Sequence, residues 1–110
     1  MPIFKTISEK QAKGKVKKIF NEIKRVRKIK KIPNFWKTLA NNPETLERTW
    51  TSLQQVMKKG ALDPMIKELI YVAVSITNNC EYCIKSHSLA AKKKGATNAM
   101  LNEMIAVVGM

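Results

Sequence analysis

The sequence predicts an all-α protein of five or six helices without a β-sheet. Signals that start and stop helices recur along the chain, and between them apolar residues return every three or four positions. No segment alternates apolar and polar residues over the length of a strand. A chain of 110 residues has the size of one domain, so we expect residues 1–110 to form a single helical bundle.

The first helix should follow Ser8 and end before Pro33, because proline interrupts a helix. The segment from Ser8 to Gln11 has the pattern of a capping box, in which the two side chains bond each other's backbone N–H groups. The apolar face that follows consists of Val16, Ile19, Phe20, Ile23 and Val26. A short second helix is expected over Phe35–Ala40.

The third helix should begin at Asn42-Pro43, because asparagine favours the N-cap and proline the first helical position. Glycine commonly follows the end of a helix, which places the end at Gly60. One apolar stripe runs along this helix and consists of Leu46, Trp50, Leu53 and Met57.

The pair Asp63-Pro64 repeats this start signal, and the helix that it opens should end at Asn78-Asn79. Apolar residues occupy most of its circumference, so we expect a central helix that is buried on nearly all sides. Glu68 lies in the middle of this apolar helix. An unpaired buried carboxylate is costly, so Glu68 should either reach the surface or have a partner.

The fifth helix should run from Cys80 to about Lys94, with Asn79 as its N-cap. Thr97 should cap a last helix, whose apolar stripe consists of Met100, Leu101, Met104, Ile105 and Val108. Residues 106–110 are apolar for a chain end, which favours burial against another subunit.

The segment from Cys80 to His87 contains the candidate reactive residues. Positions i, i+3 and i+7 share one face of a helix, so Cys80, Cys83 and His87 line up within two turns. The first-turn position favours the thiolate of Cys80 through the helix dipole. His87 lies four residues after Cys83, where a neutral imidazole can accept a thiol proton. A Glu68 side chain that faced this helix would orient the imidazole ring.

The net charge of +13 belongs to the first part of the chain. Residues 1–60 hold 16 Lys/Arg and 4 Asp/Glu, whereas residues 61–110 hold 5 and 4. Ten of the basic residues fall between Lys13 and Lys31, which raises nucleic-acid binding as an alternative function. No nucleic-acid-binding motif accompanies them and lysine-rich helix faces are usually solvated, so we expect no such role.

No apolar stretch approaches the roughly 20 residues of a membrane span, and the first residues lack the apolar core of a signal peptide. We therefore expect a cytoplasmic protein that binds no membrane. Cysteines in that compartment seldom form structural disulfides, which favours chemistry at the cysteine pair. A zinc site of Cys80, Cys83, His87 and Glu68 is a second alternative, although structural zinc sites usually use a further Cys/His pair.

The spacing of these four residues resembles the motif of the alkylhydroperoxidase D and carboxymuconolactone decarboxylase-like family. Eleven residues separate Glu68 from Cys80, two separate Cys80 from Cys83, and three separate Cys83 from His87. Flanking segments are also similar to that family, and the resemblance extends from roughly residue 12 to the end. These segments are residues 33–35, 42–43, 67–70 and 79–83.

The resemblance implies an all-α alkylhydroperoxidase D-like fold and a thiol-dependent peroxidase or disulfide oxidoreductase with antioxidant activity. Cys83 would attack a hydroperoxide and pass through a sulfenic acid, and Cys80 would resolve it as a disulfide. Glu68 and His87 would relay protons, without a cofactor or a metal. The expected partners are a hydroperoxide, a protein or small-molecule thiol reductant, and further copies of the chain in a dimer, trimer or hexamer.

One departure from the family pattern concerns Tyr82, which precedes the second cysteine. Members with well-developed peroxidase activity resemble a pattern with a second histidine at this position, so we expect a reduced proton relay. Decarboxylases of the same superfamily lack the cysteine pair, so the pair disfavours that activity.

Overall fold

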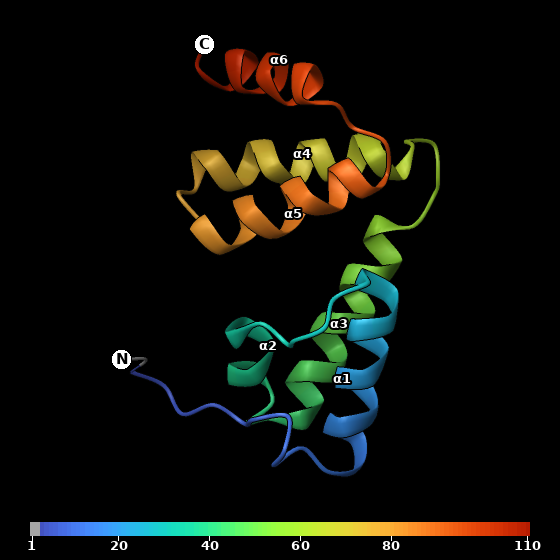
Figure 1. The fold of residues 1–110 in the computed structure, drawn as a ribbon, viewed down its shortest axis with the longest axis vertical. Helices are drawn as coiled ribbons and strands as arrows, with labels where there is room; N and C mark the ends of the chain where they lie inside the picture. Colours follow the sequence, from blue (N-terminus) through green and yellow to red (C-terminus); the bar gives the residue numbers. More distant parts are fainter. Residues whose placement is uncertain (1–2) are drawn as a thin grey trace. The chain divides into compact units, whose positions relative to one another are not determined.

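The computed structural model describes residues 3–110, which form six α-helices and no strand (Figure 1). This confirms the prediction of an all-α fold. The chain divides into two compact units, residues 1–56 and residues 57–110, which are described separately. The expectation of a single domain stays a prediction. The helices are α1 (Gly14–Arg27), α2 (Asn34–Leu39), α3 (Pro43–Met57), α4 (Pro64–Thr77), α5 (Glu81–Lys93) and α6 (Asn98–Val108).

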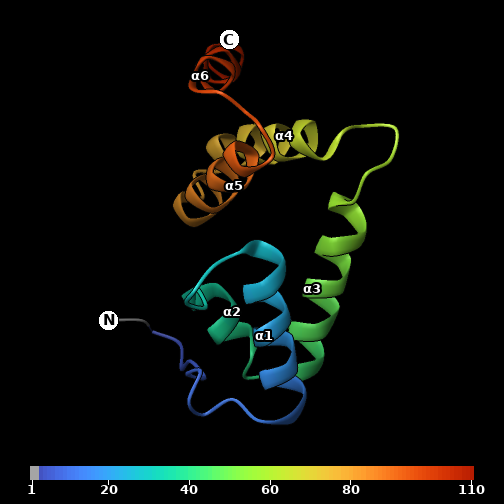
Figure 2. The same cartoon turned by 45° about the vertical axis from the view of Figure 1, so that its right-hand side comes forward.

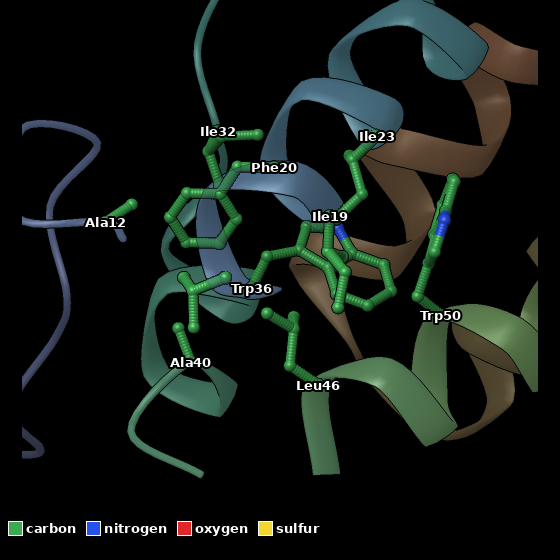
Figure 3. Close-up of a cluster of buried hydrophobic side chains, with 10 residues drawn as sticks. Ala12, Ile19, Phe20, Ile23, Ile32, Trp36, Ala40, Leu46 and Trp50 are labelled. Carbon is green, nitrogen blue, oxygen red and sulfur yellow. The ribbon is translucent and has the colours of Figure 1, made fainter. Parts of the chain in front are cut away.

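The first unit is built around one apolar cluster to which α1, α2 and α3 all contribute (Figure 3). Trp36 from α2 and Trp50 from α3 meet edge to face, with ring centroids 5.5 Å apart. The indole N–H of Trp50 donates to Glu22 on α1 at 2.9 Å, so the burial of this ring leaves no polar atom unpaired. The buried cluster consists of Ala12, Val16, Ile19, Phe20, Ile23, Ile32, Trp36, Ala40, Leu46 and Trp50.

The start of α1 differs from the prediction. Ser8 and Gln11 do form the two hydrogen bonds of a capping box, at 3.0 and 3.1 Å. They close a separate turn, however, and α1 begins later, at Gly14. Gly14 has a φ of 53°, a left-handed conformation that glycine adopts without strain, and this bend separates the turn from the helix.

The end of α1 also differs from the prediction, because the helix stops at Arg27 rather than before Pro33. Lys28 takes a left-handed conformation and closes the helix end. Glu9 then secures the segment between α1 and α2. Its carboxylate accepts from Lys24 Nζ at 2.7 Å and from the backbone N–H of Ile32 at 3.1 Å.

In the second unit, α4 and α5 lie side by side and antiparallel, and α6 packs against α4 (Figures 1 and 2). Asp63 caps α4 as predicted, since its side chain accepts from the N–H of Met65 at 2.9 Å. Thr97 caps α6 in the same way through the N–H of Met100. Within the described residues, no helix is long and apolar enough to cross a membrane.

The prediction that α4 is buried on nearly all sides is wrong within the second unit. Its fully buried residues are Glu68, Val72 and Ser75, two of them polar. The opposite face is apolar and open: Ile70 is 48% exposed and Val74 is 53% exposed. The reason is that α5 and α6 leave this side of α4 uncovered. Helix α6 likewise has no fully buried residue, although its sequence predicts an apolar stripe.

Candidate functional site

The candidate site begins at the tight turn between α4 and α5. Asn79 has a φ of 55°, and after this left-handed residue the N–H of Cys80 donates to the carbonyl of Ser75 at 2.9 Å. Cys80 is therefore the N-cap of α5, and its sulfur accepts from the backbone N–H of Cys83 at 3.4 Å. The prediction that Asn79 is the N-cap is wrong, because asparagine tolerates the left-handed conformation that the turn requires.

Cys80 and Cys83 are joined by a disulfide. Their Cα atoms lie 5.3 Å apart, within the range of about 4.4–6.8 Å that disulfides require. Both residues are only partly buried. The bond closes within one helical turn, so it constrains little of the fold. This arrangement suits a bond that opens and closes as part of a reaction.

Glu68 and His87 form the second pair of the site and come from facing positions on α4 and α5. The Nδ1 of His87 lies 2.7 Å from Oε1 of Glu68, and the two residues are 4% and 1% exposed. An ionised carboxylate only accepts hydrogen bonds, so Nδ1 carries the hydrogen of this bond. Glu68 thus has a partner, which is what burial of its carboxylate demands.

Lys94 reaches the other oxygen of the same carboxylate, with Nζ 2.5 Å from Oε2. Burial by itself raises the pKa of Glu68. The hydrogen bonds from His87 and Lys94, together with the positive charge of Lys94, outweigh burial and hold that pKa below its usual value. Glu68 is therefore a carboxylate at neutral pH, with a donor on each oxygen.

Tyr71 completes the surroundings of the imidazole. Its ring stacks on that of His87, with centroids 3.6 Å apart and an angle of 15° between the planes. Tyr71 follows Glu68 by three positions on α4, so both side chains face α5. The ring of His87 is thus fixed in position by a hydrogen bond at its edge and by an aromatic ring against its face.

The four predicted residues form two bonded pairs. The disulfide joins Cys80 to Cys83, and the hydrogen bond joins Glu68 to His87. No hydrogen bond links the two pairs within residues 3–110. His87 follows Cys83 by one helical turn on α5, which places the imidazole beside the cysteine pair.

Two residues of the site, Tyr71 and Lys94, were missed by the sequence analysis. Tyr71 carries a usable signal, because it lies at i+3 from Glu68 on the same helix. Lys94 carries none, because it is one of three consecutive lysines and only the fold selects it. In the described part of the chain, no group of three or more His, Cys, Asp or Glu side chains is arranged to hold a metal ion.

Comparison with known proteins places this chain in a family. Residues 43–110 match the profile of the carboxymuconolactone decarboxylase family. The fold matches the crystal structure of the alkylhydroperoxidase AhpD core from Rhodospirillum rubrum with a TM-score of 0.88 and 40% sequence identity. That match covers 99% of this chain and 82% of the R. rubrum chain.

Two curated proteins are similar to parts of the chain. An uncharacterized protein in the cox locus of Paracoccus denitrificans is 44% identical over 50 residues, which are 46% of this chain and 45% of that protein. An uncharacterized protein of Cupriavidus necator is 34% identical over 61 residues, which are 52% of this chain and 54% of that protein. The chain thus spans about half the length of these curated relatives.

The family profile covers the helices that carry all four predicted site residues, and the structural match extends over nearly the whole chain. The chain therefore belongs to the carboxymuconolactone decarboxylase family and has an alkylhydroperoxidase D-like fold.

Proposed function

We propose that this protein is a cytoplasmic thiol-dependent peroxidase that reduces hydroperoxides through Cys80 and Cys83. The observation that carries the proposal is a buried Glu68–His87 pair one helical turn from a disulfide-bonded cysteine pair at a helix N-terminus. A disulfide alone would suit many proteins. A disulfide beside a carboxylate-oriented imidazole has the groups that thiol chemistry needs to move protons.

The reaction balances with the groups of the site. The Cys83 thiolate attacks one oxygen of the hydroperoxide, the O–O bond breaks, and Cys83 becomes a sulfenic acid while the alkoxide takes a proton to leave as an alcohol. The Cys80 thiolate then attacks the Cys83 sulfur and displaces hydroxide, which leaves as water. Two thiols are oxidised to one disulfide, and one hydroperoxide is reduced to alcohol and water. A dithiol reductant restores the thiols by exchange.

Glu68 and His87 serve the proton transfers of this cycle. With its Nδ1–H held by Glu68, His87 offers Nε2 to accept the proton of Cys83 and to return one to the departing oxygen. Cys80 has a different source of activation, because its sulfur accepts the Cys83 N–H at the N-terminus of α5. Tyr82 stands where the pattern of well-developed peroxidases in the family has a second histidine. In the proposed relay, His87 therefore acts without a second imidazole.

The comparisons support this choice within the family. The R. rubrum protein of the same fold is described as an alkylhydroperoxidase core. The family is named for a decarboxylase, but decarboxylation has no use for a disulfide-forming pair. Nucleic-acid binding through the lysines of α1 remains the alternative, and no contact in the structure favours it.

We also propose that the protein works as a homo-oligomer. The apolar face of α4 is open in the single chain, with Ile66, Ile70 and Val74 exposed, and Ile105 and Val107 of α6 are exposed as well. Apolar patches of this kind usually mark interfaces. Helices α4 and α6 each have an apolar side that is exposed. In an oligomer, these sides of one copy are suited to pack against the apolar sides of another copy.

The first prediction tests the cysteine roles. Cys83→Ser should abolish peroxide reduction, because no thiolate is left to attack the O–O bond. Cys80→Ser should still consume one equivalent of peroxide and stop at a sulfenic acid, which mass spectrometry detects with a sulfenic-acid-specific probe. Lys85→Gln, on the exposed side of α5, is the control and should retain activity. Peroxide consumption that survives Cys83→Ser, or its absence from the unaltered protein, would rule out the mechanism.

The second prediction tests the carboxylate. Glu68→Gln keeps the shape but removes the charge that orients His87, so the rate of thiol oxidation by peroxide should fall by about 10²–10⁴-fold. Circular dichroism checks that the helices persist. Glu103→Gln, an exposed carboxylate change on α6, should leave the rate unchanged. A full rate in Glu68→Gln would mean that the cysteines act as a simple dithiol without a relay.

The third prediction concerns assembly and is measured by light scattering at a series of protein concentrations. The unaltered protein should have at least twice the mass of one chain. Ile70→Lys should shift the mass toward that of a single chain, because it places a charge in the proposed interface. Thr77→Lys, at an exposed polar position at the end of α4, is the control and should leave the mass unchanged. A monomeric unaltered protein would refute the proposed assembly.

A further inference from the structure

The Glu68 carboxylate has two partners, and the proposed reaction uses only His87. The second partner is Lys94, whose side chain is 39% exposed although it contacts a carboxylate that is 1% exposed. A lysine on the surface gains little from a single ion pair. A lysine that reaches inward to a buried carboxylate stabilises the ionised form of that carboxylate more strongly, because charges attract each other more strongly away from water. Lys94 therefore has a measurable influence on the site.

The backbone fixes the position of Lys94. It is the C-cap of α5, and its N–H donates to the carbonyls of Ala90 and Ala91 at 3.1 Å. Gly95 then turns the chain with a φ of 105°, a conformation that other residues adopt only with strain. The buried Ala96 completes the turn with an N–H bond to Ala91 at 2.9 Å. Lys94 thus starts from an ordered helix end rather than from a flexible loop.

The charge balance at the site explains why a cation is needed there. Glu68 is a buried negative charge, and the one hydrogen bond from the His87 ring only partly offsets the cost of its burial. The positive charge of Lys94 supplies the missing compensation. The groups that act on Glu68 are His87 of α5 and Lys94 at its end, while Tyr71 of α4 covers the imidazole face.

We propose that Lys94 is a positioning residue that holds the Glu68 carboxylate turned toward His87 and stabilises its ionised form. Without this cation, Glu68 would become protonated at a higher pH, and once protonated it would no longer accept the Nδ1 hydrogen bond that orients His87. The effect of Lys94 on catalysis rests on the proposed peroxidase function. Its effect on the ionisation of Glu68 does not.

The test measures the titration of the Glu68 carboxyl carbon by NMR in the full chain, with the resonance assigned by its loss in Glu68→Gln. In Lys94→Gln the pKa of Glu68 should rise by about one pH unit, at the lower end of the usual effect of a neighbouring cation because Lys94 is partly exposed. Lys94→Arg should restore the unaltered value. Lys92→Gln, which removes an exposed lysine from the last turn of the same helix, should not change it.

The thiol chemistry supplies the second readout. The acid limb of the pH profile for thiol oxidation by peroxide should move to higher pH in Lys94→Gln and return in Lys94→Arg. The shift should be absent when Lys94→Gln is made in the Glu68→Gln protein. A protein that reduces no peroxide but shows the carboxyl shift would refute the peroxidase function and keep the role of Lys94. An active protein in which Lys94→Gln and Lys92→Gln titrate alike would refute the role of Lys94.

Discussion

The buried carboxylate of Glu68 is the constraint on which the second unit depends. Taking an ion out of water costs several kcal/mol unless other groups replace the lost hydration. His87 and Lys94 do so from α5 and its end, one on each carboxylate oxygen. These two contacts fix how α5 is rotated against α4. Because Cys80 caps α5 and Cys83 lies in its first turn, the same contacts set where the disulfide lies relative to the imidazole.

The polar site also accounts for the unusual distribution of residues on α4. Buried residues of a helix are normally apolar, but two of the three buried residues of α4 are polar, Glu68 and Ser75. Its exposed side instead carries the apolar residues Ile66, Ile70 and Val74. A helix with this arrangement does not bury its apolar surface within the second unit. The proposed oligomer follows from the same constraint, because a site placed between α4 and α5 leaves the opposite side of α4 for another copy.

Local signals predicted most of the fold, and each failure has a local physical reason. Asp63 and Thr97 cap their helices as expected because an N-cap depends on one side chain and its next turn. Asn79 was assigned to the wrong position because a left-handed turn and an N-cap favour the same residue type. The role of Lys94 could not be predicted from the sequence, because its contact with Glu68 spans 26 residues and depends on how two helices pack.

The central claim is that Glu68 and His87 act on the cysteine pair as one unit. A double-mutant cycle on the rate of thiol oxidation by peroxide tests it most directly, with Glu68→Gln, His87→Gln and both changes together. If the carboxylate acts only through the imidazole, the double variant should be no slower than the slower single variant. A double variant whose loss equals the product of the two single losses would show that the residues act independently, and would contradict the account.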